Sequence, residues 1–435
     1  MTNSEIKNFS QNVSSSYHLK DKDKCNKNAC ASTCNVPKLR FKGYNDEWKH
    51  FRLKDIVKIY DGTHQTPNYI DDGIKFVSVE NIGNLEGTNK YISKVDYDKD
   101  FKIKPEINDI LMTRIGDIGT PAIIDTKENY AYYVSLALLK ADQEILFPKF
   151  FVQRILSEPF QHELWKRTLH VAFPKKINKN EIGECNVFIC SKSEQEKIAS
   201  FLTLIDKKIE KQKKLVELLK KYKRGLLSQI FSQNLRFKDD KGNDYPDWTE
   251  KTLGEITDNI SYGLNAASKK FDSKNKYIRI TDIDETTGKY NNLDIVSPDC
   301  VLSDEYKLKI NDLLFARTGA STGKTYLYNE NDGKMYFAGF LIKFSIKEEY
   351  YSNFIFYITQ TSKYQKWVSI MSTRSGQPGI NAKEYSKYKF SCPVYNEQVK
   401  ISNIISKIDN IIEKANILLD FYNDYKKGLL QKMFI

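Results

Sequence analysis

The sequence predicts an α+β fold: two tandem α+β domains, each followed by a long helix, with the two helices pairing as an antiparallel coiled coil. The stretch "EQEKIASFLTLIDKKIEK" begins at Glu194, and "EQVKISNIISKIDNIIEK" begins at Glu397. Residues 194–231 align with residues 397–434 without a gap, and the same offset aligns "NDILMTRIG" at Asn108 with "NDLLFARTG" at Asn311. These repeats indicate a tandem duplication.

Length and charge fit a nucleic-acid-binding protein of two domains. The chain has 435 residues, a net charge of +12 and a pI near 9.0. A basic balance favours a polyanionic partner, although solvated surface lysines would produce the same balance. The longest apolar run, at residues 131–139, is about half of what a membrane span needs, and the N-terminus lacks the apolar core of a signal peptide. We therefore expect a cytoplasmic protein with no membrane contact.

Residues 1–38 predict a flexible N-terminal tail, because they are polar and lack apolar periodicity. Cys25, Cys30 and Cys34 lie close enough together to suggest a zinc site, but no fourth ligand follows at a usable spacing. We favour the tail over the zinc site and expect no metal.

The two domains are expected at residues 39–193 and 234–396. Both contain short β-branched and aromatic runs between Gly, Asn, Asp and Pro turn signals, as at residues 75–79 and 277–280. Both also contain helical patterns, such as "FPKFFVQRILSEPFQHELWKR" from Phe147. This mixture indicates an α+β fold with a curved sheet in each domain.

The long helices are expected at residues 194–233 and 397–435. Steps of alternating four and three residues place apolar side chains along one stripe of each segment, as in a coiled-coil seam. An ordinary amphipathic helix packed on its own domain is the alternative. The pairing residues that we predict are Ile198, Leu202, Ile205, Ile209, Val216, Leu219, Ile401, Ile405, Ile408, Ile412, Leu419 and Tyr422.

No catalytic machinery is recognisable in the sequence. It contains no complete phosphate-binding loop, no dinucleotide-binding glycine pattern and no Asn-Pro-Pro-Tyr stretch of an amino-methyltransferase. "STGK" at Ser321 resembles part of a phosphate loop but lacks the upstream glycine spacing. We therefore expect no catalytic residue and no cofactor in this chain.

Polar loops instead carry side chains suited to DNA. Arginine and glutamine can pair with guanine and adenine edges, and lysine can hold phosphates, although each residue could equally be a solvated surface group. Arg114 and Arg317 occupy identical repeat positions just after a strand. The DNA-binding candidates are His64, Gln65, Thr66, Arg114, Lys175, Lys176, Arg279, Arg317, Lys324, Arg374, Gln377 and Asn381.

The chain resembles the specificity subunit of type I restriction-modification systems. The resemblance lies in four features taken together: the order of domain and helix, the "EQ" helix openings, the "ND-x-L-x-x-R-x-G" stretches and "LRF" before each domain. The resemblance covers about residues 39–435. It implies two target-recognition domains that each read half of a bipartite, asymmetric double-stranded DNA site.

The resemblance also implies partners for DNA methylation and DNA restriction. Two methyltransferase subunits would use S-adenosylmethionine, and restriction subunits would use ATP and Mg²⁺. A self-sufficient DNA methyltransferase or nuclease, and a coiled-coil adaptor that binds no DNA, are the alternatives. A methyltransferase or nuclease would need a cofactor motif, and an adaptor would show no salt-dependent DNA binding.

Overall fold

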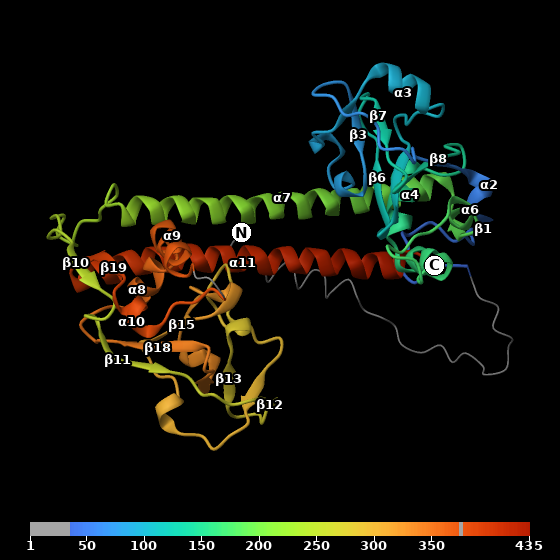
Figure 1. The fold of residues 1–435 in the computed structure, drawn as a ribbon. Helices are drawn as coiled ribbons and strands as arrows, with labels where there is room; N and C mark the ends of the chain where they lie inside the picture. The colour runs from blue at the N-terminus through green and yellow to red at the C-terminus, as the bar shows by residue number, and fades with distance from the viewer. Residues whose placement is uncertain (1–34, 374–376) are drawn as a thin grey trace, which may run out of the picture. The chain divides into compact units, whose positions relative to one another are not determined.

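The computed structural model describes residues 35–373 and 377–435 and divides the chain into two compact units (Figure 1). The first unit extends to Thr203 and includes Lys426–Ile435, and the second is Leu204–Tyr425. Cys25, Cys30 and Cys34 of the expected tail lie outside the described residues.

The first unit is a mixed α+β fold that surrounds a four-stranded antiparallel sheet of order β2-β8-β5-β6. A smaller sheet of order β4-β3-β7 contains the parallel pair β3-β7, and β1 pairs with β9. The strands are β1 (Lys49–Arg52), β2 (Val57–Asp61), β3 (Ile74–Val77), β4 (Tyr91–Ile92), β5 (Ile110–Ile115), β6 (Asp117–Ile123), β7 (Tyr130–Tyr132), β8 (Leu136–Ala141) and β9 (Asn186–Ile189). The helices are α2 (Leu53–Ile56), α3 (Lys94–Asp100), α4 (Pro148–Leu156), α5 (Glu158–Arg167), α6 (Lys179–Gly183) and the start of α7 (Lys192–Phe231).

The second unit repeats this topology. Its four-stranded sheet has the order β11-β18-β15-β16, β13 pairs in parallel with β17, and β10 pairs with β19. The strands are β10 (Thr249–Thr252), β11 (Thr257–Tyr262), β12 (Ser268–Lys270), β13 (Lys276–Ile278), β14 (Val296–Pro298), β15 (Asp312–Ala316), β16 (Thr325–Leu327), β17 (Met335–Phe337), β18 (Leu341–Ile346) and β19 (Lys389–Cys392). The helices are α8 (Ser352–Ile358), α9 (Ser362–Met371), α10 (Ala382–Ser386) and α11 (Tyr395–Met433).

The central strands form the cores because they are apolar on both faces. Residues Ile110 to Met112 of β5 and Leu313 to Phe315 of β15 are all fully buried. In the second unit, Leu227 and Ile230 from the last turns of α7 join this core together with Ile401 and Ile405 of α11. The last turns of α7 and the first turns of α11 are therefore part of the core of the second unit.

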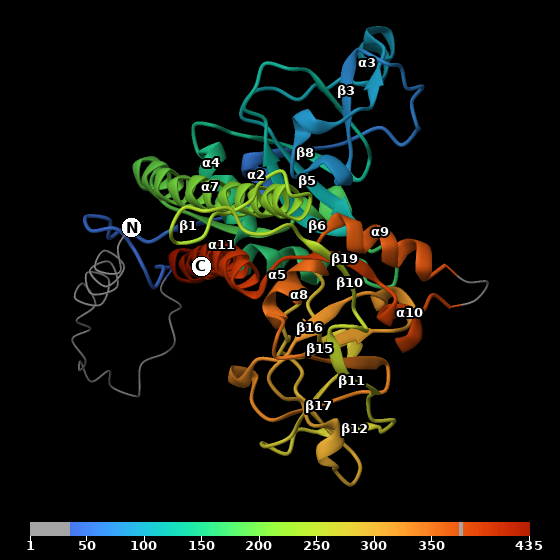
Figure 2. The same ribbon diagram turned by 90° about the vertical axis from the view of Figure 1, so that its left-hand side faces the viewer.

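The paired helices run antiparallel, as the sequence predicts. Within the second unit, α7 and α11 lie side by side in both views (Figures 1 and 2). Successive contacts pair increasing residue numbers of α7 with decreasing residue numbers of α11. The contacts are the Lys208 ammonium 4.9 Å from the Tyr422 ring centre, Gln212 Nε2 donating to Ala415 O at 2.8 Å, and Lys223 Nζ 2.5 Å from Asp409 Oδ1.

The twelve predicted pairing residues all lie at reduced exposure in the structure. Eight are buried and four are half-buried. The buried ones are Ile198, Leu202, Val216, Ile401, Ile405, Ile408, Ile412 and Tyr422, and the half-buried ones are Ile205, Ile209, Leu219 and Leu419. Among the described residues, none of the helices is long and apolar enough to cross a membrane.

Candidate nucleic-acid interface

Arg114 joins three segments of the first unit. Its backbone N–H donates to Ser135 O at 2.9 Å, its carbonyl accepts from the Ile177 N–H at 3.0 Å, and Nε donates to Val134 O at 2.8 Å. Nη1 donates to Ile177 O at 3.2 Å and lies 3.3 Å from Asp61 Oδ1. The side chain is buried, and these contacts direct its donors into the domain. Arg114 therefore holds the domain together, and its contact with DNA stays a prediction.

Arg317 makes three equivalent contacts in the second unit. Its N–H donates to Phe340 O, its carbonyl accepts from the Ile380 N–H, and its Nε donates to Gly339 O at 2.9 Å. The difference lies beside the guanidinium, where Tyr262 occupies the place that Asp61 has in the first unit. Arg317 lies 5.1 Å from the Tyr262 ring centre, a cation–π distance, and is half-buried. We call these two arginines with their carbonyl partners the arginine anchors.

A cavity of about 710 Å³ opens beside the second arginine anchor. Arg317, Asn265 and the exposed rings of Tyr262 and Phe340 line it. Planar cationic and aromatic groups around a polar amide suit stacking against, and hydrogen bonding to, a nucleobase. The sequence pointed to Arg317 but not to the two rings, whose exposure depends on tertiary packing.

Arg279 also lines this cavity, but carboxylates hold its guanidinium. Nε and Nη2 donate to Asp282 at 2.9 and 2.8 Å, and Nη2 lies 3.1 Å from Asp294 Oδ2. The hydrogen bonds and charge of these two carboxylates raise the pKa of Arg279. Arg279 thus lies at the cavity, but its donors are directed to the protein, and its contact with DNA stays a prediction.

In the first unit, a hairpin at residues 169–176 projects from the arginine anchor. Leu169 N–H donates to Lys176 O and Gly116 N–H donates to Lys175 O, both at 2.8 Å. The predicted pair Lys175 and Lys176 is exposed on this hairpin. A cavity of about 700 Å³, lined by Lys175 and by Trp165 of α5, lies beside it.

The corresponding segment of the second unit begins after α9. Gly319 N–H donates to Pro378 O at 2.9 Å, as Gly116 does to Lys175. Gln377 is exposed there, whereas Arg374 lies outside the described residues. Asn381 is the N-cap of α10, because its Oδ1 accepts from the Glu384 N–H at 2.9 Å. Asn381 therefore shapes the loop in addition to lying at its exposed end.

His64, Gln65 and Thr66 are exposed together on the loop that follows β2. Gly62 fixes where this loop begins, since a Cβ there would stand 2.4 Å from Tyr132 O. The loop therefore leaves the sheet close to the backbone of β7 and presents three polar side chains.

Lys324 lies elsewhere in the second unit. Its ammonium is 3.8 Å from Glu285 Oε2, and it shares a cavity of about 320 Å³ with Lys220, Lys223 and Arg224 of α7. The structure thus separates Lys324 from the cavity that contains Arg279 and Arg317.

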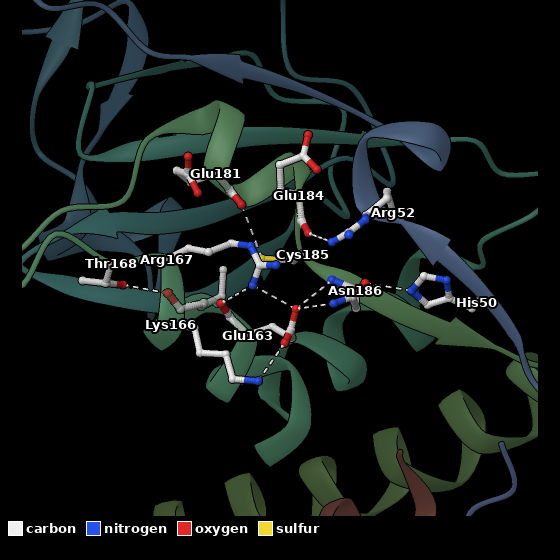
Figure 3. A network of polar contacts seen from close by, with 11 residues as sticks. His50, Arg52, Glu163, Lys166, Arg167, Thr168, Glu181, Glu184, Cys185 and Asn186 are labelled. Carbon is white, nitrogen blue, oxygen red and sulfur yellow. Dashed lines mark hydrogen bonds and ion pairs between the residues drawn. The ribbon is translucent and has the colours of Figure 1, made fainter. Parts of the chain in front are cut away.

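A polar network secures α5, the helix that precedes the hairpin of the first unit (Figure 3). Glu163 accepts from Arg167 Nη1 at 2.9 Å and from the backbone and side-chain N–H groups of Asn186 at 3.0 and 2.9 Å. Burial raises the pKa of Glu163, but the hydrogen bonds from Asn186 and Lys166 and the Arg167 charge outweigh burial and hold the pKa below its ordinary value. The ionised carboxylate therefore ties α5 to β9.

No group of three or more potential metal-ligating side chains occurs in the described parts of the chain, residues 35–373 and 377–435. The polar side chains at both surfaces are instead hydrogen-bonding and cationic groups. Such an arrangement can bind a ligand by hydrogen bonds and charge.

Comparison with known proteins gives one consistent result. Residues 45–220 and 245–419 each match the family described as type I restriction modification DNA specificity domain. The MjaX type I restriction enzyme specificity subunit of Methanocaldococcus jannaschii is 26% identical over 220 residues, which are 48% of this chain and 50% of that protein. The MjaVIII specificity subunit of the same organism is 24% identical over 124 residues, 28% of each chain. The chain thus spans about half the length of the first curated relative and less of the second.

Solved structures share the fold. The S subunit of a type I restriction-modification system from M. genitalium has a TM-score of 0.58 and 16% identity, over 92% of this chain and 99% of that chain. A chain from a structure of complex assembly and conformational transition in the type I restriction-modification system has a TM-score of 0.54 and 12% identity, over 89% and 97%.

Proposed function

Because the chain belongs to the family of type I restriction modification DNA specificity domains, we propose that it is the DNA-reading subunit of such a system. Each unit reads one half of a bipartite, asymmetric site in double-stranded DNA. The observation that carries this proposal is the repeated arginine anchor. Arg114 and Arg317 share three contacts with equivalent backbone segments, but the surfaces around them differ. One rigid frame presenting two different surfaces suits the reading of two different half-sites.

The reading surfaces follow from these positions. In the first unit, the surface comprises the loop of His64, Gln65 and Thr66 and the hairpin with Lys175 and Lys176. In the second unit, it comprises the cavity of Arg317 with Tyr262 and Phe340, and the segment with Gln377. Lysines would hold phosphates, whereas amides, the arginine and the rings would contact bases.

We assign methylation and restriction to partner subunits, which would carry the S-adenosylmethionine, ATP and Mg²⁺ sites. The long helices offer two equivalent docking positions for methyltransferase subunits. Leu218 and Tyr222 of α7 are 63% and 60% exposed, and their repeat equivalents Phe421 and Tyr425 of α11 are 50% and 39% exposed. Large apolar side chains on the outer face of a paired helix suit burial by another helix. Two equivalent patches support two such subunits per chain, acting on DNA in the cytoplasm.

The test is to map methylated adenines in the host genome with and without this gene. The proposal expects one bipartite motif to lose its methylation when the gene is removed. Co-expression with a methyltransferase subunit is expected to give a complex with two such subunits per chain by native mass spectrometry. Strong S-adenosylmethionine binding by the isolated chain, or an unchanged methylation pattern, would contradict this assignment.

The docking patches have their own test. Tyr222→Ala and Tyr425→Ala are each expected to reduce the number of bound methyltransferase subunits from two to one. Val301→Ala, an exposed apolar residue of the second unit outside both helices, is the control and is expected to leave two subunits bound. Loss of neither subunit in the double variant would contradict these docking positions.

A further inference from the structure

The tip of the hairpin at residues 169–176 is strongly apolar. Val171 is 99% exposed and Phe173 is fully exposed, so each side chain stands in solvent. A phenylalanine in water loses the favourable free energy of burial that it would gain in a core. Two such residues at one tip therefore mark a surface that another molecule covers.

The surroundings of this tip are cationic and aromatic. Residues 164–178 contain no Asp or Glu, and Lys175 and Lys176 are exposed directly beside Phe173. On the adjoining α5, the His162 ring stacks on Trp165 at 6.0 Å with an angle of 7° between the planes, and Trp165 is 60% exposed. Apolar and aromatic groups combined with positive charge complement the stacked bases and phosphates of DNA.

The base of the hairpin is fixed. Leu169 and Lys176 form a β-bridge across it, and hydrogen bonds of Lys175 and Ile177 tie its C-terminal side to Gly116 and Arg114. The preceding helix α5 is tied to β9 through the Glu163 network (Figure 3). The tip is therefore presented on a rigid support, which favours insertion into a partner over collapse onto the domain.

We propose that Val171 and Phe173 form an apolar wedge that enters the DNA half-site read by the first unit, between two stacked base pairs. Lys175 and Lys176 hold the phosphates beside the opened step. This inference rests on the proposed DNA-reading function and adds a distortion of the DNA to it. The corresponding segment of the second unit, "STRSGQPGIN" from Ser372, has no large apolar residue at its centre. Only one of the two half-sites would therefore be unstacked.

The experiment uses the full chain with its methyltransferase subunits and a duplex that the wild-type complex selects from a randomised DNA pool. 2-Aminopurine placed at successive positions reports unstacking by increased fluorescence. We expect an increase at one step within the first half-site and none in the second. Phe173→Ala is expected to abolish the increase and to weaken binding about tenfold, the scale of one lost aromatic contact with a base. Phe173→Leu is expected to retain most of both.

A rescue separates a wedge from an ordinary surface contact. A mismatch at the opened step removes part of the unstacking cost in advance. The mismatched duplex is therefore expected to bind the Phe173→Ala complex more tightly than the matched duplex does. Val95→Ala on α3, also an exposed apolar residue of the first unit, is the control and is expected to bind both duplexes like wild type.

Three results would overturn the wedge. The first is a Phe173→Ala complex that keeps the full fluorescence increase and affinity. The second is a fluorescence increase of equal size in both half-sites. The third is a Phe173→Ala chain that no longer binds methyltransferase subunits but still distorts DNA by itself. The last would mean that the tip contacts protein. A wild-type complex that selects no DNA would instead refute the proposed function, and the wedge with it.

Discussion

Arg40 and Glu194 form a two-pronged ion pair, with Nε donating to Oε1 at 2.7 Å and Nη2 donating to Oε2 at 2.8 Å. Arg236 makes the equivalent pair with Glu397, with Nη2 2.9 Å from Oε2. Both carboxylates are fully buried. The "LRF" stretch that enters each domain is thus bound to the "EQ" opening of the helix that leaves the same domain. This explains why both short stretches occur twice in the sequence.

Breaking this pair is expected to destabilise the first unit strongly. Arg40→Ala leaves the Glu194 carboxylate buried without its partner, and such changes cost about 3–5 kcal/mol. Urea unfolding of the full chain is the measurement, and the unfolding transition of the first unit is expected to move to a lower urea concentration. Glu210→Gln removes an exposed i,i+4 partner of Lys214 and is expected to leave the unfolding transition almost unchanged. Equal effects of the two variants would contradict the structural role of the buried pair.

The second prediction concerns the contribution of the arginine anchor in the first unit to stability. Arg114→Lys keeps the positive charge but cannot reproduce the hydrogen bonds to Val134 O and Ile177 O, because lysine lacks the planar fork. We expect a loss of about 2–4 kcal/mol in unfolding free energy, as for a disrupted buried hydrogen-bond network.

DNA binding distinguishes support from direct contact. If Arg114 acts by holding the hairpin, Arg114→Lys reduces affinity for the first half-site and leaves base preference at every position unchanged. Lys176→Ala is the comparison, since loss of an exposed phosphate contact lowers affinity and the salt dependence without destabilising the fold. A change in base preference with normal stability would show that Arg114 reads DNA after all.

The Glu163 network predicts a pH dependence. The pKa of Glu163 is lower in the folded chain than its ordinary value of 4.5, so ionised Glu163 contributes stability that is present above pH 4.5. This contribution is lost as the pH falls below 4.5 through the folded pKa. The stability difference between wild type and Glu163→Gln is therefore expected to be constant from pH 7 to about 5.5 and to shrink in more acidic solution.

Unfolding free energies in urea at several pH values measure this difference. Glu144→Gln, at an exposed position of the same unit, is the matched control for replacing a glutamate by glutamine. A Glu163→Gln difference that stays constant down to pH 3.5 would contradict the lowered pKa.

The sequence allowed the duplication, the fold class and the antiparallel helices to be predicted, because apolar spacing along a helix survives in the folded state as a buried stripe. Ile198 and Ile401 occupy equivalent positions and are both buried, and Ile401 packs in the core of the second unit. Arg114 shows the limit of this reasoning. A lone arginine after a strand suggests a surface group, and only folding brings Asp61, Val134 and Ile177 around it.

Phe173 shows the opposite limit. Apolar side chains are assigned to cores by default, yet Phe173 is fully exposed at a hairpin tip. The signal that could have identified it is its setting, "HVAFPKK" from His170, in which apolar residues stand among cations without helical or strand periodicity. Local sequence therefore predicts elements better than it predicts which side chains face a partner.

Modularity is the next prediction. Each unit contains its own sheet, core and arginine anchor, so residues 39–193 are expected to act as an exchangeable reader. Replacing them with the equivalent segment of a relative is expected to change one half of the methylated motif and to leave the other half intact. Genome-wide methylation mapping is the measurement. A change in both halves, or in neither, would contradict the assignment of one half-site to each unit.

We also predict that the paired helices set the spacing between the half-sites. Gln212 Nε2 donates to Ala415 O across the pair, so these two residues lie at the same level of the antiparallel helices. One heptad inserted after Gln212 and another after Ala415 therefore face each other, which preserves the apolar seam. The pair lengthens by about 10 Å, and at about 3.4 Å per base pair this corresponds to roughly three base pairs.

The same insertion rotates one reader relative to the other around the duplex by near 100°, since DNA has about 10 base pairs per turn. Two results agree with a spacing role: the non-specific spacer of the methylated motif grows by about three base pairs, or methylation is lost because the second reader faces the wrong side. A single insertion after Gln212 is the control and is expected to reduce activity and stability more, because its added turns have no partner. The double-insertion variant would refute this role if it methylated the original motif, with its original spacer, at full efficiency. If the helix pair sets the spacing, lengthening the pair must change either the spacer or the activity.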